Sequence, residues 1–513
     1  MSRTIRATIA ALFGYSRFAI AIVVGLALVP FTLRQVGPQM YGYWLASGEL
    51  LAYASLTEFG VLVTLPWLIA QADGQADRNR MRELLTTGGA AALMSASAAL
   101  VVSLVLWFVL PVVLHLAPVQ RSAVTGPVLV MALLGVVAHP LRVFTCTLTG
   151  LQDVRFIGVS DLCVMALNPI ITVVMLLNGD GLYALAFGNA VPPLIVGFVS
   201  LLRVGSIAPD LLRSWHRPRW PAIRQLFTEG TGSWIGGWGW RLFSASDGLV
   251  LASMGRPTAV AALAFTNKLA QALTQLSWVP CDSGLPGLAH LAGEHPGPRL
   301  RQAIVVMVRV YLALAGSVAC VIIAVNPAFV RGWVGLNFFA GDKANFIIAM
   351  LVVAMTFGHA LAVVSSVLGQ RIQLGVATLL SGIIHVALAF GLGLRFGIVG
   401  VLFAGLLSHG LVFALLAWRP FAKATGMPET AVLSEILRPW LWRLAPLVAM
   451  ALVIQKLLGT PRLPVTIAVG ALMGLFGVWH MRPLYLEFGP VRTLYDRFFK
   501  WLPFRDAPGE KAA

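Results

Sequence analysis

The sequence predicts an all-α, polytopic membrane protein with about fourteen transmembrane helices. Of its 513 residues, 58% are hydrophobic and 11% are charged, whereas soluble domains carry about 25% charged residues. The mean hydropathy is +0.84, and roughly 20 apolar residues in a helix are enough to span the hydrocarbon core of a bilayer. Apolar runs follow one another along most of the chain, so the bilayer rather than water is the expected solvent of the fold.

Fourteen apolar runs approach or exceed this length. Short segments that contain glycine, proline and charged residues separate them, as expected of turns at the membrane surface. The runs cover residues 9–33, 42–70, 86–110, 122–148, 155–177, 180–203, 232–254, 258–284, 301–325, 344–368, 373–394, 397–418, 440–458 and 463–481.

The distribution of Lys and Arg predicts that both termini are cytoplasmic. The net charge is +17 and the pI is about 10.6, values that would point to nucleic acid in a soluble protein. With the N-terminus inside, the inner segments hold 23 of the 37 Lys and Arg residues, the outer loops eight and the predicted helices six. Cytoplasmic loops carry such an excess and face anionic lipid, so membrane lipids and not nucleic acid are the expected contacts.

Weak internal repeats divide the chain near its middle into two lobes of six helices. Three short motifs return at offsets of 216 to 219 residues: Gly37-Pro38 as Gly255-Arg256-Pro257, Gly150 as Gly369, and 181–189 as 397–405. A six-helix repeat keeps its orientation, so a pseudo-twofold axis along the membrane normal should relate the lobes. The expected parts are an N-lobe (1–203), a basic linker (204–231), a C-lobe (232–418), an appended helix pair (419–481) and a basic cytoplasmic tail (482–513).

The tail contains an amphipathic stretch at 485–505. Its apolar residues fall at helical spacing, and four basic residues accompany them. This pattern favours a helix that lies in the inner membrane interface. A helix that binds a protein partner is the alternative.

The cysteines are expected to be packing residues. Each lies in or beside an apolar run and no Cys-x-x-Cys pair occurs, so neither a disulfide framework nor a metal site is expected. The sequence has no Walker A motif, so we expect neither ATP nor another cofactor. The four cysteines are Cys146, Cys163, Cys281 and Cys320.

Ionisable residues inside the predicted helices mark the candidate site. Such a group costs roughly 2.5–3.5 kcal/mol at the bilayer centre and therefore usually faces a wet cavity or a partner. Glu49 and Glu58 are nine residues apart, about 2.5 helical turns, and point to opposite faces. Glu58 is nearer mid-membrane and is the candidate for ion coupling, with a structural ion pair as the alternative. Glu49 is expected to reach water at the outer end of its helix.

Arg17 on the first run and Arg142 on the fourth are candidate binding residues. A cation in a central cavity would attract an anionic headgroup. Arg142 follows a His139-Pro140 kink, and Arg17 lies about two turns from the inner face. Snorkelling of these long side chains to the inner surface is therefore an open alternative.

Lys268, Gln271 and Gln275 form a polar stripe on the eighth run. They fall at i, i+3 and i+7 of an otherwise apolar helix, and residues at this spacing share one face. The stripe is expected to line water or a ligand. Hydrogen bonds to a neighbouring helix are the alternative.

The seventh run contains most of the segment GTGSWIGGWGWR at 230–241, whose glycines suit close packing or bending. Trp234, Trp238 and Arg241 share one face, and aromatic rings beside a cation can stack on a sugar and hold a phosphate. For Trp234 we prefer an aromatic belt at the inner membrane interface. Asp247, further along, is a second candidate for ion coupling or a partner for Lys268.

The order of these motifs resembles that of the Wzx-like polysaccharide flippases of the MOP exporter superfamily. The first hairpin carries a basic residue, Gly-Pro-x-x-Tyr-Gly and Glu-Phe-Gly, and Asp247 matches an Asp that these proteins often carry on the seventh helix. One departure is at 260–263, where the family commonly has a Tyr. The resemblance covers about residues 5–420, and its other segments are 149–152, 264–268, 285–289 and 331–335.

The resemblance implies a flippase, not an enzyme, that moves polyprenyl-diphosphate-linked oligosaccharides across the bacterial inner membrane by alternating access. Such proteins serve O-antigen, exopolysaccharide or capsule biosynthesis, and a polysaccharide polymerase or assembly protein is a conceivable partner. A lipid II flippase of the MurJ type and a drug or cation antiporter of the same superfamily are alternatives. A polytopic glycan polymerase or ligase is a further one, but such enzymes usually carry a large outer loop, and the longest here is about 18 residues.

Overall fold

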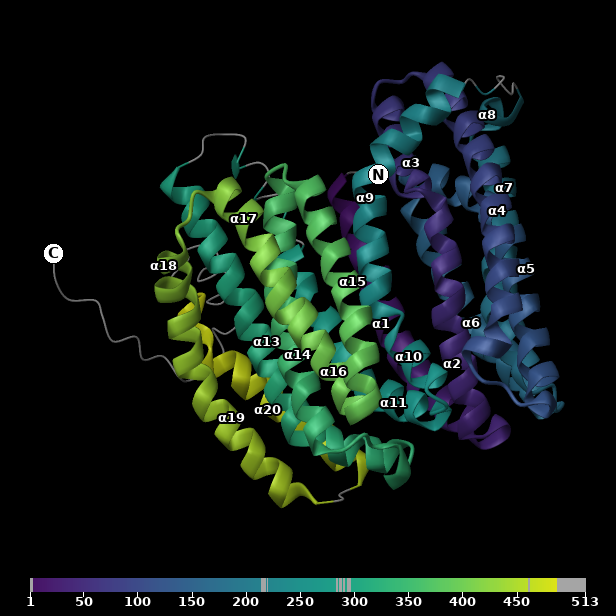
Figure 1. The fold of residues 1–513 in the computed structure, drawn as a ribbon. Coiled ribbons are helices and arrows are strands. Elements are labelled where there is room, and N and C mark those ends of the chain that lie inside the picture. Colours follow the sequence, from purple (N-terminus) through teal and green to yellow (C-terminus); the bar gives the residue numbers. More distant parts are fainter. Residues whose placement is uncertain are drawn as a thin grey trace. The chain divides into compact units, whose positions relative to one another are not determined.

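The computed structural model consists of helices and the turns between them (Figure 1), which confirms the predicted all-α class. It describes residues 3–459 and 462–486, apart from 214–217, 219, 283–284, 286–287, 289–290 and 293–296, and no strand occurs among them. The chain forms two compact units whose boundaries differ from those of the expected lobes. Unit 1 is Met1–Lys268, Val330–Ile347 and Arg371–Phe413, and unit 2 is Leu269–Phe329, Ile348–Gln370 and Ala414–Ala513.

The described chain has ten helices long and apolar enough to cross a membrane, or up to 11 if the bent pair Ile20–Val36 and Pro38–Glu58, which meet at 118°, is one span. The protein is therefore a multi-pass membrane protein, while the predicted count of fourteen is not confirmed. The ten helices are α4 (Arg78–Val113), α5 (Pro118–Gly150), α6 (Val154–Leu177), α7 (Leu182–Ile207), α13 (Pro298–Trp333), α14 (Asp342–Val367), α15 (Arg371–Phe396), the composites Ile398–Thr425 and Glu429–Leu458, and α20 (Leu463–His480).

The expected spans outside this set of ten are the polar or interrupted ones. They carry most of the candidate charges, and helices that face a wet cavity need no uniformly apolar surface. Their polarity is thus what a cavity lining would show. The helices concerned are α1 (Arg3–Val36), α2 (Pro38–Ala52) with the 3-10 segment η1 (Tyr53–Glu58) and α3 (Val61–Gly74), α9 (Trp220–Ser244) with α10 (Asp247–Ser253), and α11 (Pro257–Asp282).

Proline and aspartate residues set the start of several helices. Pro38 occupies the first turn of α2 after Gly37, whose φ is 80°. Asp77 caps α4 by accepting a backbone N–H of its first turn at 2.9 Å. Asp153 does the same for α6 at 3.4 Å. Because these residues favour helix starts, three of the predicted turns lie where the sequence placed them.

Two of the predicted spans are broken helices. Within the span at 42–70, α2 continues into η1, which ends at Glu58. Phe59 and Gly60 follow in the left-handed conformation, with φ of 50° and 73°, and α3 begins after them. Glycine adopts this conformation readily and allows the sharp change of direction. The span at 232–254 is likewise interrupted between α9 and α10. A broken helix inside a membrane releases backbone groups that need other partners.

In unit 1, α9 lies beside α15 (Figure 1), and glycines line their crossing. A Cβ on Gly382 would lie 2.5 Å from the Gly239 carbonyl oxygen and 2.9 Å from the Cβ of Leu242. Small residues let membrane helices approach this closely. The glycine run that follows residue 232 therefore serves close packing, one of its two predicted roles.

Backbone conformations repeat at the predicted offset. Gly181 and Gly397 precede α7 and α16 (Ile398–Gly405) with φ/ψ of 56°/−129° and 58°/−135°. Gly37 and Gly255 also match, with φ of 80° and 72°. Non-glycine residues rarely adopt these angles. The third pair differs, because Gly369 has a positive φ of 92° and Gly150 does not, so the internal repeat and the axis relating the lobes stay predictions.

Unit 2 packs around α13. The indole N–H of Trp440 donates to the Leu312 carbonyl at 2.7 Å, and a Cβ on Gly477 would lie 2.8 Å from the Ser317 hydroxyl oxygen. Both helices of the expected appended pair thus contact α13 within this unit. The unit's further elements are α17 (Ala414–Thr425), α18 (Glu429–Ala431), the π-helical η4 (Val432–Leu437), α19 (Arg438–Leu458) and η5 (Arg482–Leu484).

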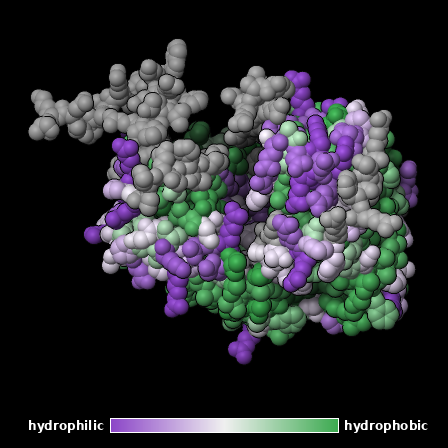
Figure 2. Space-filling model, turned by 90° about the horizontal axis from the view of Figure 1, so that it is seen from above, coloured by the Kyte–Doolittle hydropathy of each residue, from purple (hydrophilic) through white to green (hydrophobic). Residues whose placement is uncertain are grey.

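The expected linker at 204–231 is more helical than predicted. The helix α7 extends to Ile207, α8 (Pro209–Arg213) follows, and α9 already begins at Trp220. Figure 2 shows hydrophilic side chains gathered on part of the face seen from above, with hydrophobic residues beside them. The amphipathic stretch predicted at 485–505 lies, after its first two residues, outside the described residues.

Candidate substrate and ion-coupling site

Glu58, a predicted coupling carboxylate, forms an ion pair with Arg142. Their side-chain oxygen and nitrogen atoms are 2.9 Å apart, and 13% of the Glu58 side chain and 54% of the Arg142 side chain are exposed. The pair joins η1 to α5 beside the break in the second span. It brings together two residues predicted for different roles, and it matches the ion-pair alternative for Glu58.

Arg17 also has an acidic partner. Its guanidinium on α1 lies 3.0 Å from a carboxylate oxygen of Asp161 on α6, and both side chains are about half exposed. Ion pairs as open as this one contribute roughly 0–1 kcal/mol in water. Arg17 therefore stays accessible to an anionic group, as its predicted binding role requires.

Asp247 is paired with His385, not with Lys268. The Nε2 of His385 lies 2.8 Å from Oδ1 of Asp247, and its Nδ1 lies 3.1 Å from the Ser408 hydroxyl. His385 is completely buried, whereas 28% of the Asp247 side chain is exposed. The pairing predicted with Lys268 is thus replaced by a buried chain of polar groups that runs from α10 through α15 into the π-helical segment η3 (Leu406–Phe413).

Glu49 adjoins this chain, and the expectation that it reaches outer water is wrong. Its Oε2 accepts the backbone N–H of Leu249 at 2.7 Å. A Cβ on Gly248 would come within 2.6 Å of its Oε1. The carboxylate therefore satisfies backbone released at the break before α10. Helical spacing separated Glu49 from Glu58 correctly but could not show which helix each one faces.

Trp234 contacts residues at the break in the span at 42–70. Its indole N–H donates to the Leu56 carbonyl at 2.6 Å, and its ring stacks on Phe59 with centroids 4.9 Å apart. Trp234 thus supports the fold at this break, and its place in an interfacial belt stays a prediction. Trp238 packs edge-on against it. Within the described part of the chain, the buried indole N–H of Trp238 has no hydrogen-bond partner, which leaves a donor for a ligand.

The two broken spans therefore stabilise each other, an arrangement we call the reciprocal contact. Glu49 of the broken span at 42–70 accepts a backbone N–H of the broken span at 232–254. Trp234 of the latter donates its indole N–H to a backbone carbonyl of the former. Between these points the backbones touch, because a Cβ on Gly60 would lie 2.8 Å from the Gly230 carbonyl oxygen. Sequence reasoning could not find this contact, since its partners lie 178 and 200 residues apart.

Arg241 lies close to the acidic chain. It is half-buried on α9, and its charge acts on the Tyr53 phenol together with those of Glu49 and Asp247. Among the described residues no ion pair involves Arg241. A cation next to acidic groups, without a dedicated partner, is suited to recruit a ligand anion.

Lys268 and the polar stripe are exposed. Lys268 faces α1, where a Cβ on Gly25 would lie 3.6 Å from its Cε. Gln271 and Gln275 are exposed on the same helix. None of the three makes a side-chain hydrogen bond to another described residue, and their lining role stays a prediction.

Sequence reasoning missed Asp282, the last residue of α11. Its Oδ1 accepts the Tyr311 hydroxyl at 2.6 Å and lies 2.9 Å from Nε2 of His359. Trp278 stacks on His359 with centroids 4.0 Å apart. This second histidine–aspartate pair belongs to unit 2. The available signal was an acidic residue at the end of an apolar run.

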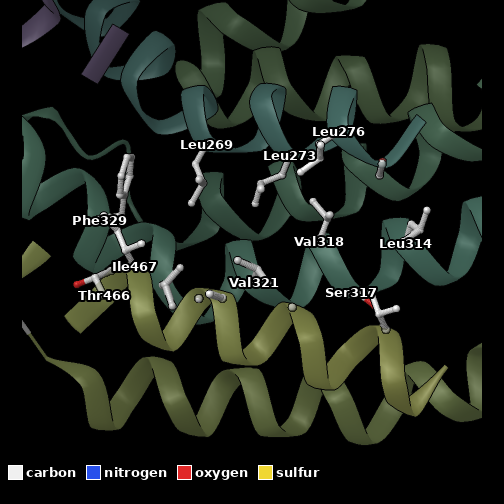
Figure 3. Close-up of a pocket in the computed structure, with 16 residues that line it drawn as sticks. Leu269, Leu273, Leu276, Leu314, Ser317, Val318, Val321, Phe329, Thr466 and Ile467 are labelled. Carbon is white, nitrogen blue, oxygen red and sulfur yellow. The ribbon is translucent and has the colours of Figure 1, made fainter. Parts of the chain in front are cut away.

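Unit 2 also contains an apolar cavity of about 510 Å³. Figure 3 shows Leu269 and Leu273 of α11, Val318 and Val321 of α13, and Ile467 of α20 around it. Serine and threonine hydroxyls are the polar groups of its lining, and they belong to Ser277, Ser317 and Thr466. A cavity of this composition fits hydrocarbon far better than a hydrated group.

The cysteines differ in burial, and Cys163 is exposed although a packing role was predicted for each of them. All four are free thiols, and Cys281 and Cys320 are buried. Cys146 donates to the Leu62 carbonyl at 3.3 Å. In the described part of the chain, no three His, Cys, Asp or Glu side chains are grouped as a metal site would need.

The fold of this chain combines many apolar helices with interrupted spans and with ion pairs between helices. Solved structures that share the fold belong to transporters and flippases. An inward-facing multidrug-resistance MATE transporter of the MOP superfamily has a TM-score of 0.63 at 12% identity, over 83% of this chain and 99% of its own. Lipid II flippase MurJ has a TM-score of 0.60 at 13% identity, over 93% of this chain and 99% of its own.

A third likeness is to a mutant of the Vibrio cholerae MATE transporter VcmN, with a TM-score of 0.53 at 13% identity over 83% of this chain and 99% of that one. At these identities the likenesses show the fold alone. No protein-family model matches the sequence, and no curated protein matches it at a significant level.

Proposed function

We propose that this protein is a flippase for polyprenyl-diphosphate-linked oligosaccharides in the bacterial inner membrane. The observation that carries the proposal is a set of side chains in unit 1 that have hydrogen-bond donors without a partner among the described residues. Arg241 and Lys268 have no acidic partner among the described residues, and Trp238 has an unused indole N–H. Cations hold a diphosphate and an indole face stacks on a sugar ring, so the set fits an anionic glycolipid headgroup.

A drug or cation antiporter would need acidic groups more than free cations at its binding site. The carboxylates of Glu49, Glu58, Asp161 and Asp247 are instead engaged by arginine, histidine or backbone N–H groups.

Analysis of the lipid-linked glycans of a deletion strain tests the proposal. Mass spectrometry of the extracted lipids should show a complete oligosaccharide repeat unit on polyprenyl diphosphate, together with loss of surface polysaccharide. Build-up of lipid II would instead indicate the MurJ-type function, which the likeness over 93% of the chain favours as second candidate. No build-up, with altered drug or ion sensitivity, would indicate an antiporter and refute the flippase.

Two substitutions test the headgroup site directly. Arg241→Ala and Lys268→Ala should abolish glycan export at unchanged protein level, because each removes a cation that would bind the diphosphate. Arg224→Ala, which removes an exposed arginine from the same helix as Arg241, is the matched control and should export normally. Normal export in both test variants would refute the site.

A further inference from the structure

We propose that unit 2 binds an anionic phospholipid, with its phosphate at Arg443 and one acyl chain in the apolar cavity beside it. The inference goes beyond the proposed flippase, because it concerns a lipid that stays bound and not the transported cargo. It lies wholly within unit 2, whereas the groups proposed for the cargo headgroup belong to unit 1. The two proposals can therefore fail separately.

The apolar cavity of unit 2 offers no vacant polar group to a guest. Its hydroxyls on Ser277, Ser317 and Thr466 each donate to a backbone carbonyl three or four residues earlier in the chain. Apolar cavities of this kind accept apolar ligands and exclude water. The volume of about 510 Å³ suits one fatty acyl chain, whereas a polyprenyl chain is much larger.

One end of the cavity adjoins the point where α19 begins and α20 ends. Figure 3 shows Ser317 at the end of the cavity opposite Thr466. Next to Ser317, a Cβ on Gly316 would lie 3.1 Å from the Leu444 side chain on α19 and 3.4 Å from the Met481 side chain after α20. A guest in the cavity can therefore extend from this end toward the ends of both helices.

Two buried polar atoms at this level have no hydrogen-bond partner among the described residues. They are Nε of Arg443, next to Leu444, and Nε2 of His480, next to Met481. The Nε of an arginine always carries a hydrogen, and an imidazole nitrogen needs a partner in either tautomer. A buried charged donor without an acceptor is costly, so these atoms point to a ligand with acceptor oxygens.

The surroundings of Arg443 favour an anion. Arg482 follows α20, and its guanidinium carbon lies 4.3 Å from the centroid of the Trp479 ring. The two ion pairs described in unit 2 use Asp282 and Glu435 and involve neither Arg443 nor Arg482. A phosphate diester carries the negative charge and the paired oxygens that a guanidinium binds.

Exposed tryptophans indicate that this end of the helix pair lies at a membrane interface. Trp442 is 75% exposed and Trp479 is 43% exposed, and tryptophan is enriched at the level of the lipid headgroups. The distribution of Lys and Arg predicts this end on the inner side, where basic sites between helices bind anionic headgroups. Phosphate and acyl chain of one inner-leaflet lipid thus match Arg443 and the cavity.

Native mass spectrometry of the full-length protein tests the phosphate position. Delipidated protein in detergent is titrated with phosphatidylglycerol, which should bind as one tightly held molecule. Arg443→Gln should weaken this binding roughly tenfold to a hundredfold, as expected when a charged hydrogen-bond donor is lost. Arg438→Gln, which changes an exposed arginine of the same helix, is the matched control. Equal binding by the two variants would overturn the assignment to Arg443.

A filled cavity tests the position of the acyl chain. Ala471 lines the cavity from α20, so Ala471→Phe should reduce phosphatidylglycerol binding, and Ala471→Leu is the smaller change if the first variant fails to fold. The neighbouring Leu472 is 67% exposed and lies outside the lining, so Leu472→Phe should bind as the unchanged protein does. Unchanged binding in the filled variant would overturn the cavity as the acyl site.

The choice of lipid separates the sources of the phosphate. Phosphatidylethanolamine with the same acyl chains has no net charge and should bind about tenfold more weakly than phosphatidylglycerol. Equal binding of the two would overturn the anionic site. Tighter binding of polyprenyl phosphate would assign the site to the cargo and overturn the phospholipid. Phosphatidylglycerol binding as expected, without glycan accumulation in the deletion strain, would refute the flippase alone.

Discussion

Replacing Gly382 by alanine should force α9 and α15 apart. The new Cβ would lie 2.5 Å from the Gly239 carbonyl oxygen, about 1 Å less than a relaxed contact of roughly 3.5 Å. Two helix backbones cannot yield as a flexible side chain can, so the cost should be near the upper end of the ~1–3 kcal/mol for overpacking. Alanine regains about 1 kcal/mol of helix propensity, which leaves a net loss of roughly 1–2 kcal/mol.

The same helix provides the control. A Cβ on Gly391 would meet nothing within 4 Å, so Gly391→Ala keeps the propensity gain without the clash. The assay is the apparent unfolding midpoint of the detergent-solubilised protein, followed by the loss of its monodisperse peak in size-exclusion chromatography. Gly382→Ala should have the lower midpoint of the two variants. Equal midpoints, or a higher one for Gly382→Ala, would refute the close crossing.

Two further substitutions test the contacts of the second span. Arg142→Ala should destabilise the protein by ~1–3 kcal/mol because it leaves the Glu58 carboxylate without its partner. Combining it with Glu58→Gln should recover part of this loss, and thermal unfolding measures both variants. No recovery in the double variant would contradict the ion pair. Trp234→Phe keeps the stacking on Phe59 but removes the donor to the Leu56 carbonyl, so it should cost about 1–3 kcal/mol, and an unchanged unfolding midpoint would contradict that hydrogen bond.

The sequence predicts the helical architecture because each apolar run and turn carries a local signal. Gly37-Pro38 and the aspartate caps mark helix starts from their own chemistry. The two breaks were not predicted. At Phe59 and before Asp247 the apolar pattern continues, and the chain bends because distant groups, such as Trp234, take up the released backbone. Such compensation leaves no periodic trace in the sequence.

The candidate site could be predicted by residue type and face but not by partner. Helical spacing put Lys268 on an open polar stripe and separated Glu49 from Glu58. It could not pair Asp247 with His385, because 138 residues lie between them. An isolated histidine in a long apolar helix is a signal that a partner exists, but the partner is set by how the helices pack.

The reciprocal contact has a consequence for how the protein is made. Leu56 and Glu49 leave the ribosome 178 and 200 residues before the groups that will satisfy them. At 5–20 residues per second, the first broken span waits roughly ten to forty seconds for the second. During biogenesis the nascent N-terminal segment therefore carries unsatisfied polar groups at membrane depth, and it must be sheltered by water or by the insertion machinery until Trp234 and Leu249 are synthesised.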